Sequence, residues 1–349
     1  MRMQEIARIL HQYPPDCHPS RVQPLGSAGG MSGAQFWRIT TPRGELALRR
    51  WPPEHPSPER LRFIHTVLAH AAQNGVMFLP VPIAGRNNQT FVEESGHFWE
   101  LMPWLPGTAD YERNPSVDKL RAALRALAKF HIAAATFGVG GQAETRPGSS
   151  ATAINRHLSR LHDLSHGGVH KLAHAITDAT WPDLAPLARQ FVAEQPRVVP
   201  YAIAQLEPLA AVTLPLQPCI RDIWHEHVLF TGNEVTGIID FGAIDIDTPA
   251  TDIARLLGSL VPVSPPRSGE GPGEGESAGW QIGFAAYSAV RPLSAIEHEA
   301  IKALDTSGPI LAGCNWIRWI YVEGRIFKNR GQVIDRFRGA LARVLQQRA

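Results

Sequence analysis

Residues 219–230, CIRDIWHEHVLF, and residues 235–242, VTGIIDFG, are the most informative part of the sequence. Each contains a short apolar run, and the residues between them are typical of a tight turn, so together they predict a β-hairpin. Asp222 and His227 precede the first strand of this hairpin, and Asp240 follows the second. Because a hairpin returns to its starting point, we expect these three side chains to converge.

Two carboxylates at one place suit the transfer of a phosphoryl group. A metal ion that bridges phosphate oxygens needs hard oxygen ligands, and Asp240 supplies them. Asp222 is placed to accept the proton of an attacking hydroxyl group. Gly242 is expected to give the backbone the freedom to present Asp240. The sequence therefore predicts a kinase of small hydroxyl-bearing molecules, with Asp222 as catalytic base and Asp240 as metal ligand.

The chain upstream of the hairpin has the pattern of a small β-rich lobe. Residues 21–51 predict a strand, a glycine-rich loop and two further strands. A serine–proline pair at residues 57–58 is typical of a helix start. Strand patterns around residues 89–92 and 98–102 follow, so the expected order is β-β-β-α-β-β. Alternation along the third strand turns Arg49 inward.

After residue 102 the pattern becomes helical. Residues 117–135 carry apolar side chains at helical spacing, and helical patterns dominate much of the remaining chain. The glycine- and glutamate-rich residues 264–279 predict a mobile loop. We therefore expect an α+β fold of two lobes, a small β-rich N-terminal lobe of residues 1–102 and a larger helical C-terminal lobe of residues 103–349.

The composition is that of a globular protein and gives information on its binding partners and location. The chain has 349 residues, 44% of them hydrophobic, and a formal net charge of +2. This balance gives no reason to expect a nucleic-acid or membrane partner. Three distant cysteines predict no disulfide framework and favour the cytoplasm. The N-terminus is expected to be a short amphipathic helix rather than a secretory signal, with an apolar face of Ile6, Ile9, Leu10 and Tyr13.

The hairpin and its surroundings resemble the aminoglycoside phosphotransferase family, which includes choline kinases and homoserine kinases and has a protein-kinase-like fold. That family shows H-G-D-x-H-x-x-N followed by I-D-F/W. Asp222 matches the catalytic aspartate, Asp240 matches the aspartate of the second motif, and His227 stands where the family has a metal-binding asparagine. Residues 247–254, DTPATDIA, resemble the segment D-P-x-x-D-L-A, which implies that Asp252 supports the catalytic loop.

The resemblance extends over residues 22–260 and implies a site for ATP with magnesium or manganese. Residues 25–33, LGSAGGMSG, resemble the glycine loop over the phosphates, Arg49 stands where the family holds the α- and β-phosphates, and residues 99–102 resemble the hinge that pairs with adenine. The implied ATP contacts come from Gly29, Gly30, Ser32, Arg49, Glu100 and Met102. Glu59 is the candidate acid for pairing with Arg49, although its position at a helix start also suits a cap.

Departures from the family pattern leave other functions open. Ile220 and Arg221 replace the His and Gly before the catalytic aspartate, and His227 is a softer ligand than an amide oxygen. These changes would suit a nucleotide-binding module without catalysis. Asp222, His225 and His227 also have the spacing of a metal-dependent hydrolase. The acceptor of the kinase is left open among antibiotics, choline, homoserine and sugars.

Overall fold

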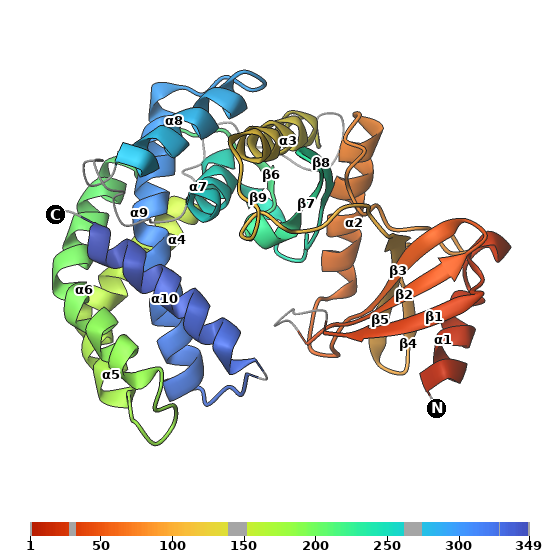
Figure 1. Ribbon diagram of the computed structural model, residues 1–349, viewed down its shortest axis with the longest axis horizontal. Helices are drawn as coiled ribbons and strands as arrows, with labels where there is room; N and C mark the ends of the chain where they lie inside the picture. Colours follow the sequence, from red (N-terminus) through yellow and green to blue (C-terminus); the bar gives the residue numbers. More distant parts are fainter. Residues whose placement is uncertain (1, 28–32, 139–151, 262–273, 328, 348–349) are drawn as a thin grey trace. The chain divides into compact units, whose positions relative to one another are not determined.

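The computed structural model describes residues 2–27, 33–138, 152–261, 274–327 and 329–347 (Figure 1). By packing, the chain forms two compact units, residues 1–137 with 226–244 and residues 138–225 with 245–349. The predicted lobe boundary after residue 102 lies inside the first unit. The boundary stays a prediction, because the two units are defined by packing and the two lobes by nucleotide and acceptor binding. Gly29, Gly30 and Ser32 lie outside the described residues.

The first unit contains a five-stranded antiparallel sheet with the strand order β1-β2-β3-β5-β4 (Figure 1). The predicted order β-β-β-α-β-β is confirmed, with one short helix before it. The bounds of these elements are α1 (Arg2–Leu10), β1 (Arg21–Gly26), β2 (Gln35–Thr41), β3 (Gly44–Arg50), α2 (Pro58–Gln73), β4 (Val92–Glu94) and β5 (His97–Pro103).

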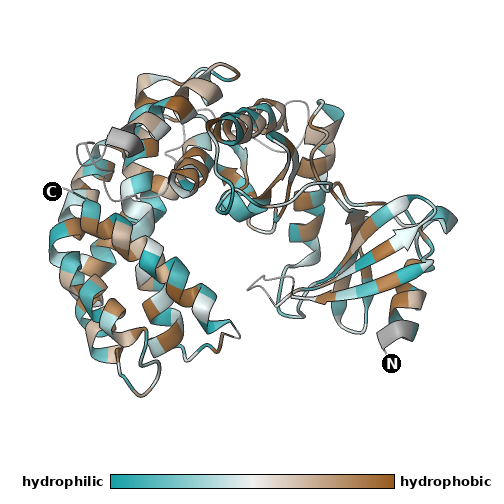
Figure 2. Ribbon diagram, viewed as in Figure 1, coloured by the Kyte–Doolittle hydropathy of each residue, from teal (hydrophilic) through white to brown (hydrophobic). Residues whose placement is uncertain are grey.

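The two faces of this sheet have different characters, because successive side chains of a strand point to opposite faces. One face packs on α1 and forms a hydrophobic core, and the alternation of apolar and polar residues along the strands is visible in Figure 2. The predicted apolar face of α1 is confirmed for Ile6, Ile9 and Leu10, and Tyr13, which joins the same core, lies beyond the end of the helix. Arg49 follows the core residue Leu48 and Glu100 lies between the core residues Trp99 and Leu101, so both belong to the other face.

Both helices of the first unit that follow β3 begin at serine caps. Ser57 accepts a hydrogen bond from the Arg60 amide at the start of α2, and Ser116 accepts one from the Lys119 amide at the start of α3 (Val117–Ala135). Such caps satisfy amides that have no partner within the helix. The predicted bounds of the helix at residues 117–135 are confirmed.

The predicted hairpin also belongs to the first unit. It consists of β7 (Val228–Thr231) and β8 (Glu234–Ile238). The connector after β5 pairs with it, because Thr108 and Phe230 exchange two backbone hydrogen bonds of 3.0 and 2.9 Å. At Gly107, with φ +97°, an added methyl group would lie 2.8 Å from the Phe230 carbonyl oxygen. Only glycine fits this close approach, which ties the hairpin to the end of β5.

The second unit is mainly helical, with one small sheet of two antiparallel strands. Helix α9 (Ala295–Ile317) packs against α4 (Thr152–Asp163), α6 (Ala185–Leu206), α7 (Pro249–Leu260) and α10 (Arg330–Gln346). The other bounds are α5 (Val169–Ala175), β6 (Gln217–Cys219), β9 (Asp245–Asp247) and α8 (Glu274–Ser288), with π-helical turns at Leu164–Gly168 and Arg318–Val322. No helix in the described part of the chain is long and apolar enough to cross a membrane.

The prediction of a loop over residues 264–279 is wrong at the C-terminal end of that range. Residues 274–279 form the first turns of α8, and residues 264–273 lie outside the described ranges. Glycine-rich composition favours a loop, but packing overrides it here. A methyl group added to Gly279 would lie 2.9 Å from Val261, so glycine allows α8 to approach that side chain closely.

Candidate functional site

Arg49 is a buried cation on the sheet face opposite α1. Its side chain lies between two acids, with Nη1 at 3.8 Å from Glu100 Oε1 and Nη2 at 3.8 Å from Asp240 Oδ1. The guanidinium stacks on the ring of Trp51, with Cζ at 3.3 Å from the ring centroid. Burial lowers the pKa of Arg49, while Glu100 and Asp240 oppose that shift. An arginine in a protein stays protonated, so a positive charge is held inside the site.

The guanidinium of Arg49 has unused hydrogen-bonding capacity. Both acids lie beyond hydrogen-bond distance of it, and its buried Nε has no hydrogen-bond partner among the described residues. A buried donor without a partner is costly, by about 1–3 kcal/mol. An anionic ligand such as a phosphate group would supply the missing acceptors, because arginine binds phosphate through two parallel hydrogen bonds.

Glu100 is the acid that pairs with Arg49, and sequence reasoning assigned it only to the hinge. The two residues lie directly opposite each other in the pairing of β3 with β5. Glu59, the candidate from the sequence, is wrong as this partner, since its side chain is 77% exposed and pairs with Arg62. Met102 lies two residues further along β5, opposite Ala47. Its contact with adenine stays a prediction.

Asp240 follows β8 in a strained conformation. Its φ of +65° lies in the left-handed region that residues other than glycine rarely adopt. Such strain, about 1–3 kcal/mol, occurs mainly at functional sites. The side chain is 47% exposed, and His227 Nε2 lies 3.7 Å from its Oδ2. The predicted meeting of His227 and Asp240 is therefore seen in the first unit, while their roles as metal ligands stay predictions.

Gly242 serves a different purpose from the expected one. The backbone turn occurs at Asp240 itself, and Gly242 has no positive φ. A methyl group at position 242 would instead lie 3.3 Å from the ring of Trp51, on which Arg49 stacks. Glycine thus leaves space beside the indole that a methyl group would crowd. Phe241, which lies between Asp240 and Gly242 in sequence, is buried, and its ring centroid lies 5.8 Å from that of Phe130 of α3.

Asp222 belongs to the second unit, so its convergence with Asp240 stays a prediction. Its carboxylate is exposed and forms an ion pair with Arg255 of α7. The preceding residue, Arg221, has a φ of +66°, a conformation that glycine adopts more readily. A glycine, which the family motif has at this position, would adopt this φ without a steric penalty. Arg221 tolerates the position here and pairs with Asp245 at 2.9 Å.

Asp252 holds the backbone before Asp222. Its fully buried carboxylate accepts hydrogen bonds of 2.6 Å from the amides of Ile220 and Arg221. A carboxylate with two amide donors fixes the direction of the chain at this point. Ile220, which replaces the histidine of the motif, is itself buried. Asp252 therefore fixes the backbone before Asp222, while its role in supporting a catalytic loop stays a prediction.

Replacing Asp252 with asparagine is expected to lower the free energy of unfolding by about 3 kcal/mol, because one amide loses its acceptor and meets a second N–H donor. Urea unfolding followed by circular dichroism measures the change. Asp335→Asn is the matched control, since the ion pair that Asp335 forms among the described residues, with Arg338, is exposed and should matter by less than about 0.5 kcal/mol. Equal effects of the two variants would contradict this account of Asp252.

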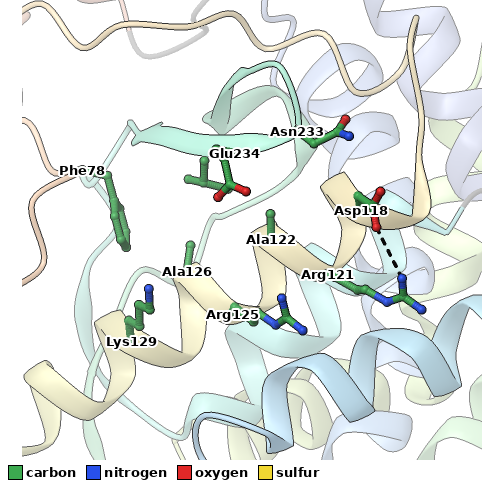
Figure 3. A pocket seen from close by; sticks show the side chains of 10 residues that line it. Phe78, Asp118, Arg121, Ala122, Arg125, Ala126, Lys129, Asn233 and Glu234 are labelled. Atoms are coloured by element: carbon green, nitrogen blue, oxygen red, sulfur yellow. Dashed lines mark hydrogen bonds and ion pairs between the residues drawn. The ribbon is translucent and has the colours of Figure 1, made fainter.

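A pocket of about 400 Å³ lies at the other end of the hairpin (Figure 3). One wall is the exposed side of α3, with Arg121, Arg125 and Lys129 one turn apart, and the other is the turn around Asn233 and Glu234. Arg121 pairs with Asp118 on the same helix. None of the predicted site residues lines this pocket. It is therefore distinct from the surroundings of Arg49 and Asp240.

Comparison with known proteins relates the chain to one family. The sequence profile of the phosphotransferase enzyme family matches residues 23–293. Homoserine kinase from Bradyrhizobium diazoefficiens is 25% identical over 258 residues, which are 72% of this chain and 67% of that kinase. Homoserine kinase from Rhodopseudomonas palustris is 27% identical over 232 residues, 66% of this chain and 62% of that kinase. The chain spans about two thirds of the length of these curated relatives.

A solved structure shows the same architecture. Amicoumacin kinase, in complex with AMP-PNP and Ca²⁺, aligns with a TM-score of 0.64 at 13% identity, covering 98% of this chain and 92% of that chain. At this identity the likeness concerns the fold. It confirms the predicted α+β architecture with a β-rich N-terminal part and a larger helical C-terminal part.

Proposed function

We propose that the chain, which belongs to the phosphotransferase enzyme family and is a kinase of small-molecule hydroxyl groups, uses ATP with magnesium or manganese. The proposed acceptor is homoserine or a similar small amino alcohol, and the proposed location is the cytoplasm. The observation that carries the nucleotide part of the proposal is Arg49, a buried guanidinium that lacks hydrogen-bond acceptors among the described residues. The acceptor rests on the homoserine kinases that the chain resembles.

Each residue of the proposed site has a separate task. Arg49 binds phosphate oxygens of ATP through its unused donors. Asp222 orients the acceptor hydroxyl group and takes its proton. Asp240 would hold the metal with His227 beside it, and the metal would neutralise charge on the phosphates. The half-exposed carboxylate of Asp240 fits that task, because a hard cation requires an accessible oxygen.

A kinase assay tests the proposal. Purified protein is incubated with ATP, magnesium or manganese, and separately with homoserine, choline, a sugar or an aminoglycoside, and ADP formation is followed together with product mass. We expect a phosphorylated product with homoserine or a related amino alcohol. Absence of both ATP binding and product across the panel would overturn the proposal. Product from an aminoglycoside alone would overturn only the choice of acceptor.

The departures near Asp222 favour a second candidate, a nucleotide-binding module without catalysis. Arg221 and His227 replace residues that the family motif uses, although Arg221 has a positive φ, which glycine adopts readily. This candidate predicts ATP binding without any ADP formation. Family membership favours the kinase over the metal-dependent hydrolase, which would instead show tightly bound zinc or iron by elemental analysis.

Changing His227 to asparagine is expected to raise turnover with magnesium relative to manganese by about threefold. An amide oxygen is a harder ligand than imidazole, and magnesium prefers oxygen. Initial rates with each metal, at saturating ATP, give this ratio for the variant and the wild type. An unchanged ratio would show that His227 does not take part in metal binding.

A further inference from the structure

A buried series of polar side chains connects α2 with Arg49. Thr90 Oγ1 lies 2.6 Å from Nδ1 of His65, and Nε2 of the same ring lies 2.6 Å from Oε2 of Glu100. The other oxygen of Glu100, Oε1, lies 3.8 Å from Arg49. His65 and Glu100 are each 3% exposed. Both ring nitrogens are thus engaged, so the orientation of the imidazole is fixed from two sides.

The one acidic residue in the sequence of α2 is Glu59, which is exposed at the helix start and does not pair with Arg49. The carboxylate that faces Arg49 comes instead from the adjacent strand, because Glu100 lies opposite Arg49 in the sheet. A glutamate side chain on a strand can adopt several staggered rotamers, and a hydrogen-bonding neighbour can select one of them. In the described part of the chain, the side-chain neighbour that hydrogen-bonds to Glu100 is His65.

We propose that His65 is a positioning residue of the nucleotide site. It holds the Glu100 carboxylate in the orientation that keeps the Arg49 guanidinium ready for the phosphates, so that α2 acts on the nucleotide through a histidine and a strand glutamate. The inference rests on the proposed function, because the contact of Arg49 with phosphate is part of that function. It adds His65, a residue outside the motifs quoted for the family, to the residues needed for ATP binding.

The test is the affinity for ATP of two leucine variants of the same helix, measured by isothermal titration calorimetry with magnesium present. His65→Leu removes the hydrogen bonds to Thr90 and to Glu100. We expect it to weaken ATP binding about tenfold, which corresponds to the loss of one hydrogen bond to a charged group, here the Glu100 carboxylate. His70→Leu is the matched control, because His70 lies in α2 but bonds to Thr136. We expect it to bind ATP as the wild type does.

A conservative variant separates positioning from packing. Glutamine at position 65 retains an amide donor that can reach Glu100, so His65→Gln should recover ATP binding to within about threefold of the wild type. In the kinase assay, His65→Leu should raise the KM for ATP more than it lowers kcat. A role in packing alone would lower the melting temperature of both variants and leave these values unchanged.

The outcomes distinguish this inference from the proposed function. If the wild type binds ATP and His65→Leu binds it equally well, the inference is overturned and the proposed function stands. If the wild type neither binds ATP nor forms product in the kinase assay, both are overturned. Should His65→Leu fail to fold, Thr90→Val provides the second measurement. It removes the hydroxyl that holds Nδ1, and an unchanged affinity in that variant would also overturn the inference.

Discussion

Asp240→Asn is expected to lower kcat about a thousandfold while the protein stays folded. Asparagine keeps the shape of the side chain but loses the charge that would hold the metal on the phosphates. Asparagine also tolerates positive φ better than most residues, so it accepts the φ of +65° at this position. The loss should therefore be one of chemistry rather than of folding.

The experiment measures kcat at saturating ATP and acceptor, together with the melting temperature. Glu234→Gln serves as the control, because Glu234 is an exposed carboxylate at the turn of the same hairpin. We expect this control to retain wild-type turnover. If Asp240→Asn keeps more than about a tenth of the activity, Asp240 is not the essential metal ligand.

Asp222→Asn is expected to lower kcat by about a hundredfold to ten-thousandfold, the usual contribution of a general base. The affinity for ATP should change little, because the proposed phosphate contact is made by Arg49. Asp222 is exposed, so the substitution should not destabilise the fold. Calorimetry with ATP and the kinase assay are performed on the same preparation.

This variant also decides between the two candidate functions. Turnover that falls with Asp222→Asn, while ATP still binds, identifies a catalytic residue in an active kinase. Turnover equal in wild type and variant would mean that any ADP formed comes from another source, and would favour the module without catalysis. Asp335→Asn, on the surface of α10, provides the control for loss of one acidic charge.

Local patterns in the sequence predicted much of the fold. The helix at residues 117–135 has the expected bounds because a serine cap and a regular apolar stripe are both local signals. The hairpin was equally visible, since two apolar runs flank a turn. Strand β9, by contrast, has three residues, too few to show a period, and is defined only by its pairing with β6.

The candidate site was predicted in part for a similar reason. The alternation of β3 placed Arg49 on the correct face, because side-chain direction follows from position in a strand. Its pairing with Glu100 depends on the register between strands that lie some fifty residues apart, which no local pattern contains. The contact of His65 with Glu100 also joins distant elements, so neither could be predicted before the structure.

The space beside Trp51 has an evolutionary consequence. Gly242 leaves room for the indole, and the indole in turn supports the flat guanidinium of Arg49. The three positions should therefore change together among relatives rather than one at a time. Where position 51 carries tryptophan we expect a small residue at position 242, and a large residue at 242 should coincide with a smaller one at 51. Lineages that lost the stack would then also be free to carry lysine at position 49.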